Sequence, residues 1–152
     1  MQHLIIAVGR WKSDPEKALY EHYRARIQPA LELREVEEKK RLQGSELKRR
    51  EGELLLAAIP DGAQVIALDG SGKTLASRDI AKAIGRWRDD GIRQTALLIG
   101  GADGHDAAVL KRADLKLSLG PQTWPHLMVR AMLAEQLYRA QSILAGHPYH
   151  RE

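Results

Sequence analysis

The stretch LIIAV, residues 4–8, sets the fold class of this chain of 152 residues. Its residues are all apolar, without the alternation that marks a strand with one face in water. A second run of the same kind, ALLI, occupies residues 96–99. Short continuous apolar runs are typical of central strands in a parallel sheet that helices cover on both faces. The two runs therefore predict an α/β protein.

Outward from these runs, strand patterns and helix patterns alternate along the chain. We expect strands at residues 3–8, 31–36, 64–68, 95–99 and 115–119. We expect helices from Asp14 to about Arg26, from an N-cap at Ser45 to Pro60, from an N-cap at Ser77 to Gly91, at 107–112 and at 126–144. No repeat or linker interrupts the alternation. It predicts a single domain over residues 1–152, built as a mostly parallel sheet sandwiched between helices.

Composition narrows the possible classes of protein. The chain has no cysteine, which excludes disulfides, zinc–thiolate sites and cysteine nucleophiles, and which fits a reducing cytoplasm. No run approaches the roughly 20 apolar residues of a membrane span, and the first residues do not form a signal peptide. We therefore expect a cytoplasmic protein with no membrane partner. The net charge of +4 favours a polyanionic partner, although a basic solvated surface explains it equally well.

The segment ALDGSGKT, residues 67–74, follows a predicted strand and partly matches a phosphate-binding loop. Gly72, Lys73 and Thr74 fit that motif, but Ala67 stands where its first glycine belongs. Asp69 would also place a carboxylate inside the phosphate cradle. We therefore interpret the segment as a glycine-rich turn at the carboxyl end of a strand, and we disfavour a nucleotide hydrolase.

Two further segments follow predicted strands. LLIGGADG, residues 97–104, has adjacent glycines that let a ligand approach the backbone, although a tight turn explains them equally well. LSLGPQTWPH, residues 117–126, is stiffened by two prolines and suits a flat polar ligand such as adenine. Ligands of open parallel sheets bind at the carboxyl ends of the strands. We expect all three segments to meet at that edge.

The last predicted helix and the tail behind it hold further candidates. The helix has apolar residues at steps of three and four, a stripe that would suit packing against a two-fold partner. Its charged residues Arg130, Glu135 and Arg139 are expected at the surface. In the tail, His147 and His150 have the spacing of a metal pair, but nothing completes a coordination sphere, so we expect no metal.

Two basic runs, residues 39–41 and 48–50, flank a glycine-containing turn. Runs of this kind are usually solvated faces. They could also contact a phosphate backbone, which would add affinity without sequence specificity.

Taken together, four segments resemble one family. AVGR (7–10), LDGSGK (68–73), LLIGGADG and the whole stretch from LSLGPQTWPH to GHPYHRE (117–152) resemble the RlmH family. These are pseudouridine methyltransferases of bacterial large-subunit ribosomal RNA and minimal SPOUT methyltransferases. The resemblance covers the whole chain. It implies a parallel α/β sheet with a C-terminal trefoil knot, a homodimer, and methylation of ring nitrogen N3 of a pseudouridine in 23S ribosomal RNA of the assembled ribosome.

The resemblance also implies the residues that bind S-adenosylmethionine. By position these are Leu68, Gly100, Leu119, Gly120, Pro121, Gln122, Thr123 and Trp124. For catalysis, residue type suggests His150 as the base, Arg151 as a cation that stabilises developing charge, and Tyr149 as a group that stacks on or hydrogen-bonds the target base. The alternative is a ribosome-binding assembly factor of the same fold that has lost catalysis.

Overall fold

The computed structural model describes residues 1–12 and 14–151. Its centre is a parallel sheet of five strands in the order β2-β1-β4-β3-β5. The strands are β1 (Gln2–Val8), β2 (Glu32–Val36), β3 (Gln64–Thr74), β4 (Gln94–Ile99) and β5 (Leu115–Ser118). The two continuous apolar runs form β1 and β4, which are central neighbours, so the predicted fold class is confirmed.

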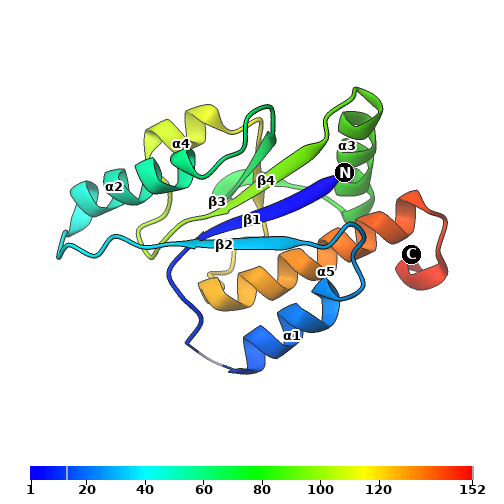
Figure 1. The fold of residues 1–152 in the computed structure, drawn as a ribbon, viewed down its shortest axis with the longest axis horizontal. Helices are drawn as coiled ribbons and strands as arrows, with labels where there is room; N and C mark the ends of the chain where they lie inside the picture. Colours follow the sequence, from blue (N-terminus) through cyan, green and yellow to red (C-terminus); the bar gives the residue numbers. More distant parts are fainter. Residues whose placement is uncertain (13, 152) are drawn as a thin grey trace.

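Helices cover both faces of the sheet. They are α1 (Asp14–Arg24), α2 (Gly44–Ala57), α3 (Ser77–Asp89), α4 (Ala107–Arg112) and α5 (His126–Leu144), followed by a 3₁₀ turn, η1 (Pro148–His150). Figure 1 shows α2 and α4 on one side of the sheet and α1 with α5 on the other. The helix α3 shares the core of α1 and α5. No helix in the described residues is long and apolar enough to cross a bilayer.

The side chains of β1 explain why its sequence does not alternate. Leu4 and Ile6 point into the core beneath α2 and α4, whereas Ile5 and Ala7 point into the core beneath α1, α3 and α5. Every residue of the run therefore enters one of two apolar cores, and none faces water. This is the physical reason that the run predicts a covered parallel strand.

The expected N-caps at Ser45 and Ser77 are wrong. The N-cap of α2 is Gln43, two residues before Ser45, and the N-cap of α3 is Ala76, one residue before Ser77. The Ser77 hydroxyl donates to Oε1 of Gln136 at 2.7 Å, so it serves a contact with α5 rather than its own helix. Local sequence cannot reveal this partner on a distant helix.

The glycine-rich turn expected after residue 68 is also wrong, because β3 continues to Thr74. Leu68 and Lys73 both pair with Leu117 of β5, so the residues between them form a bulge in the strand. A Cβ on Gly72 would lie 2.6 Å from the backbone carbonyl of Lys116. Only glycine permits this approach of the two backbones, so its role is packing against β5.

The expected surface position of Arg130 is wrong as well, because its side chain is fully buried. The apolar stripe of α5 packs against α1 and α3 in the core of its own chain. It is therefore not free to pack against a partner, and the reason given above for a dimer does not hold. Glu135 and Arg139 are partly exposed, at 19% and 26% of their side-chain surface.

Candidate functional site

The three expected loops meet at one edge of the sheet. Gly100 and Leu119 directly follow β4 and β5, and Leu68 lies in β3 just before its bulge; the three strands are parallel neighbours. His105 lies beneath this edge and its Nε2 is 3.2 Å from the carbonyl oxygen of Leu98. Burial lowers the pKa of His105, and hydrogen bonds with the backbone of Leu98 and Leu68 oppose that effect. His105 thus links the ends of β3 and β4.

A small hollow of about 140 Å³ opens at this edge. Five of the eight expected cofactor residues line it, namely Leu68, Leu119, Gly120, Gln122 and Trp124. Gly100, Pro121 and Thr123 do not line it. The Trp124 indole Nε1 donates to the Leu119 carbonyl at 3.1 Å, and the Ser118 hydroxyl bonds with the backbone of Gly120. These bonds hold the loop in a compact form.

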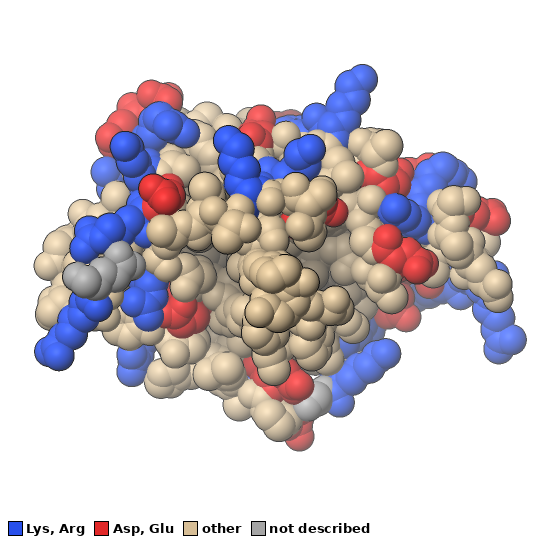
Figure 2. Space-filling model, turned by 180° about the vertical axis from the view of Figure 1, so that it is seen from behind, with Lys and Arg blue, Asp and Glu red and all other residues tan. Residues whose placement is uncertain are grey.

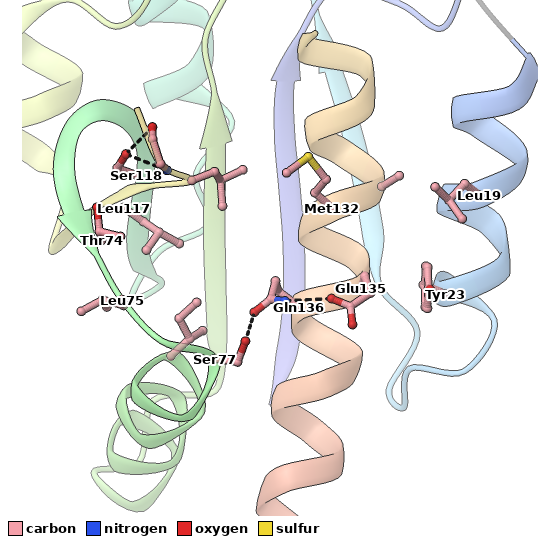
Figure 3. Close-up of a pocket in the computed structure, with 14 residues that line it drawn as sticks. Leu19, Tyr23, Thr74, Leu75, Ser77, Leu117, Ser118, Met132, Glu135 and Gln136 are labelled. Atoms are coloured by element: carbon pink, nitrogen blue, oxygen red, sulfur yellow. Dashed lines mark hydrogen bonds between the residues drawn. The ribbon is translucent and has the colours of Figure 1, made fainter. Parts of the chain in front are cut away.

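A larger hollow of about 480 Å³ lies on the other side of residues 117–120. Figure 3 shows it between the β3–α3 segment and α1, with Met132, Glu135 and Gln136 of α5 in the middle. Leu19 and Tyr23 of α1 form its far wall. Sequence reasoning missed these lining residues. A signal was present in α5, where the polar pair Glu135 and Gln136 interrupts an apolar helix.

Hydrogen bonds connect the polar residues of this larger hollow. The Ser77 hydroxyl donates to Gln136, and the Gln136 amide donates to Oε2 of Glu135 at 2.8 Å. The guanidinium of Arg139 donates to Oε1 of Glu135 at 2.9 Å. Glu135 is therefore held from two sides, and its carboxylate stays fixed at the wall of the hollow.

The tail turns back onto α5. Gly146 has a positive φ of 72°, and the His147 N–H donates to the Ser142 carbonyl at 2.8 Å. The Tyr149 hydroxyl donates to Oε1 of Glu135 at 3.1 Å, and Arg139 donates to the His150 carbonyl at 3.2 Å. The tail therefore docks on the residues that line the larger hollow.

The predicted catalytic residues differ in their surroundings. Burial raises the pKa of Tyr149 well above its usual value, and bonds with Tyr23 and Glu135 add to the effect, so its hydroxyl is a neutral donor. The Nδ1 atom of His150 is buried and has no partner within the described chain. Arg151 is exposed. The last residue of the predicted tail, Glu152, lies outside the described residues.

Two other sequence candidates have defined surroundings. His147 Nδ1 accepts the backbone N–H of Tyr149, and residues 1–12 and 14–151 contain no group of three potential metal ligands. In the basic runs, Arg50 pairs with Glu38 and Glu53, and Arg49 pairs with Glu53. Residues 39–41 are exposed.

Comparison with known sequences gives a match over nearly the whole chain. A family model described as "Predicted SPOUT methyltransferase" matches residues 1–150. The ribosomal RNA large subunit methyltransferase H of Paramagnetospirillum magneticum is 57% identical over 151 residues, which is 99% of each chain. The protein of the same name from Rhodospirillum centenum is 55% identical, also over 99% of each chain.

Two solved structures share the fold. A methylase family protein from Haemophilus influenzae superposes with a TM-score of 0.60 at 11% identity, and the match covers 99% of this chain and 70% of that one. A protein from a study of 2′-OH methylation of C/U34 on tRNA gives a TM-score of 0.50 at 21% identity, over 96% and 97% of the two chains. At these identities the likeness concerns the fold alone.

Proposed function

The chain belongs to the SPOUT methyltransferases, within the ribosomal RNA large subunit methyltransferase H family, and from this premise we propose its reaction. It transfers a methyl group from S-adenosylmethionine to ring nitrogen N3 of a pseudouridine in 23S ribosomal RNA of the assembled ribosome, in the cytoplasm. The observation that carries the proposal is the full-length match at 57% identity, joined to three segments that meet at one edge of the sheet: the bulge of β3 and the loops behind β4 and β5.

The residues at the sheet edge fit this cofactor. The small hollow has apolar walls from Leu68, Leu117 and Val129, which suit the faces of adenine, and a polar rim of loop backbone. A hydrogen bond from Ser71 lowers the pKa of Asp69, so a carboxylate is available for the ammonium group. The small hollow is less than the 300 Å³ or more of typical ligand pockets. We therefore assign both hollows, on the two sides of residues 117–120, to cofactor and substrate together.

The tail supplies the groups that act on the RNA base. When bound, S-adenosylmethionine supplies an electrophilic methyl group on a sulfonium. Ring nitrogen N3 carries an imide proton, which has to leave before or during transfer, and we assign His150 as its acceptor. Arg151 stabilises the negative charge that develops on the flanking carbonyls. Tyr149 is fixed by Glu135 and contacts the base. The unpartnered, buried Nδ1 of His150 supports this assignment.

We propose a homodimer that uses a helical face rather than the buried stripe of α5. Leu19 of α1 and Met128 of α5 are exposed large apolar residues, at 48% and 36%. Leu19 lines the larger hollow together with Met132, which is one turn from Met128. Figure 2 shows a face whose middle is uncharged and hollowed, with Lys and Arg concentrated toward its rim. An uncharged centre with a polar rim is the usual anatomy of an interface.

Light scattering tests the dimer. The wild-type chain should have the mass of two copies at micromolar concentration, and Met128→Glu should shift it toward one copy. A wild-type monomer would contradict the proposal.

We propose that the C-terminal segment forms a trefoil knot by passing through the loop of β3, α3 and β4. Connections in proteins are nearly always unknotted, so this needs support beyond the strand order. Support comes from Thr74, Leu75 and Ser77, which line the same hollow as residues 117–120, and from the Ser77–Gln136 bond.

Mechanical unfolding tests the knot. When the chain is pulled at residues 1 and 151, its contour length should be shorter than that of an unknotted chain, because a tightened knot retains residues. An unknotted chain spans at most about 3.6 Å per residue. Pulling on residues 1 and 115 should give the full length. Full length in both experiments would exclude the knot.

The reaction itself is tested on ribosomes. Mass spectrometry of 23S ribosomal RNA from a strain that lacks the gene should show an unmethylated pseudouridine, and restoring the gene should restore the methyl group. In a thermal shift assay, S-adenosylmethionine or its demethylated product should stabilise the protein, whereas ATP with magnesium should not. A non-catalytic assembly factor predicts no change in the RNA and no stabilisation by either ligand.

A further inference from the structure

Arg130 is a fully buried arginine in the second turn of α5. Its Nη1 donates to Oε2 of Glu35 at 2.7 Å, and its Nη2 donates to the Gly9 carbonyl at 3.0 Å. The guanidinium carbon lies 4.5 Å from the centre of the Trp11 ring. The Trp11 backbone N–H donates to the same Glu35 oxygen at 2.9 Å. We call these four residues, Gly9, Trp11, Glu35 and Arg130, the inner cluster.

Net stability does not explain the inner cluster well. The Arg130 guanidinium is fully removed from water, whereas Glu35 keeps 22% of its side-chain surface exposed. Burying a charge costs nearly as much as its ion pair returns, so a well-packed apolar residue often serves a core equally well or better. The Nε atom of Arg130 is also buried without a partner in the described chain, which adds to the cost. What an arginine fork does provide is a fixed geometry between several groups at once.

The geometry that the inner cluster fixes is the start of α5. Gly9 directly follows β1, and Glu35 lies near the end of β2, so Arg130 ties α5 to the ends of two strands. A Cβ on Gly9 would lie 3.6 Å from Nε2 of His126, the first residue of α5. Both contacts act at the end of the helix that directly follows residues 119–124.

The loop of residues 119–124 is thereby fixed at both ends. Its first end is held by the bonds between Ser118 and Gly120 at the end of β5. Its second end runs into α5, where Val129 lines the small hollow beside the buried Arg130. A shift of α5 along its axis would move Trp124 and open the bond from its indole to Leu119.

We propose that Arg130 is a positioning residue: through Glu35 and Gly9 it fixes the start of α5 and so sets the position of residues 119–124 for binding S-adenosylmethionine. Arg130 touches neither cofactor nor substrate. The inference rests on the proposed function for the identity of the ligand. The position of the loop itself does not depend on that identity.

The test uses a double variant, Arg130→Met with Glu35→Gln, in the full-length chain. It removes both charges together and leaves an oxygen for the Trp11 N–H, so no buried charge is left unpaired. The matched control is Arg10→Met with Glu37→Gln. This pair also joins the segments behind β1 and β2, at 3.0 Å, but it is exposed and does not touch α5.

Three properties are measured on each variant: affinity, the Trp124 resonance and the kinetic constants. Calorimetry should show that the double variant binds S-adenosylhomocysteine about tenfold or more weakly than wild type, because small displacements of a binding group have large effects. In ¹⁵N spectra, the Trp124 indole resonance should shift. The KM for S-adenosylmethionine should rise while kcat at saturation stays within a factor of about two. The control variant should keep the wild-type affinity, Trp124 resonance and kinetic constants.

The outcomes separate the two proposals. A folded double variant with wild-type affinity and an unshifted Trp124 resonance would overturn the role of Arg130. If the wild-type protein binds no S-adenosylhomocysteine, the proposed function fails, and the Trp124 resonance still decides whether Arg130 positions the loop. If the double variant does not fold, Arg130→Lys decides. It keeps the charge and loses the fork, and it should shift Trp124 and weaken binding in part.

Discussion

Two arginines of helix α5 each pair with a glutamate at nearly the same distance. Arg130 lies 2.7 Å from Glu35 of β2, and Arg139 lies 2.8 Å from Glu135 of α5 itself. The two glutamates are similarly exposed, at 22% and 19%, but Arg130 is completely buried in the inner cluster, whereas Arg139 is 26% exposed. We call Glu135, Arg139 and Tyr149 the outer cluster. One pair thus joins α5 to the ends of β1 and β2, and the other holds the C-terminal tail against α5.

A tyrosine packs against the inner cluster and another belongs to the outer cluster, and the two differ in whether the hydroxyl has a partner. Tyr20 packs against Trp11 with ring centres 5.5 Å apart, and its buried hydroxyl has no partner in the described chain. The Tyr149 hydroxyl donates to Glu135. Beside the inner cluster the phenol only fills space, whereas in the outer cluster it anchors the tail. Depth in the protein therefore decides what similar side chains do.

Removing the tail should have the largest effect. A chain that ends at Pro148 should lose methylation of ribosomes completely, because the proposed base and cation are gone. Its thermal unfolding midpoint should stay close to wild type, since η1 rests on the outside of α5. Retained methylation would show that the outer cluster has no part in the reaction.

The substitution Arg151→Ala should have the second-largest effect on methylation. Loss of one charge that stabilises the developing anion typically lowers kcat by about 100-fold or more. The affinity for S-adenosylhomocysteine should stay unchanged, because Arg151 lies away from the small hollow. Lys111→Ala on α4 removes an exposed charge elsewhere and serves as the control. Equal turnover in both variants would exclude the role of Arg151.

Disrupting the two pairs should lower the free energy of unfolding in urea by different amounts. Glu35→Ala leaves Arg130 buried without its carboxylate and should lower the free energy of unfolding by about 3 kcal/mol. Glu135→Ala should lower it by about 1 kcal/mol or less, because water can reach Arg139. Equal losses would mean that burial does not distinguish the pairs.

The smallest expected effect concerns the phenols. Burial raises the pKa of Tyr20 to about 12 and also raises that of Tyr149, where bonds with Tyr23 and Glu135 contribute. Glu135→Gln should therefore lower the pKa of Tyr149 in an ultraviolet titration, whereas Glu35→Gln should leave that of Tyr20 nearly unchanged. An unchanged pKa of Tyr149 would show that Glu135 does not act on its hydroxyl.

The sign of the pH effect follows from these raised pKa values. At pH 7 both phenols are neutral in the folded and the unfolded chain, so they give no pH dependence there. Above pH of about 10 the unfolded chain ionises first, and the free energy of unfolding should fall.

The parts of the fold that sequence predicts are those with a local signal. Residues 4–8 and 96–99 are recognisable as covered strands because every side chain in them is apolar. The bounds of α5, 126–144, follow from its own periodicity. The edge where the three loops meet follows from the alternation of strands and helices, since parallel strands share one carboxyl edge.

What the sequence does not predict depends on residues far apart in the chain. The burial of Arg130 needs Glu35 and Gly9, and Gly72 is required by the backbone of Lys116. The larger hollow combines α1, the end of β3 and α5. Single residues in these places have ordinary surface signatures, because their partners are known only once the chain is folded.

The order of the strands also bears on aggregation. The outer strands β2 and β5 carry exposed charges, Glu32 and Arg34 on one and Lys116 on the other, whereas the middle of the sheet between them is apolar. Charged residues on outer strands oppose the addition of a further strand from another molecule. Both margins of the sheet therefore resist the addition of a strand, which favours association of copies through helical surfaces.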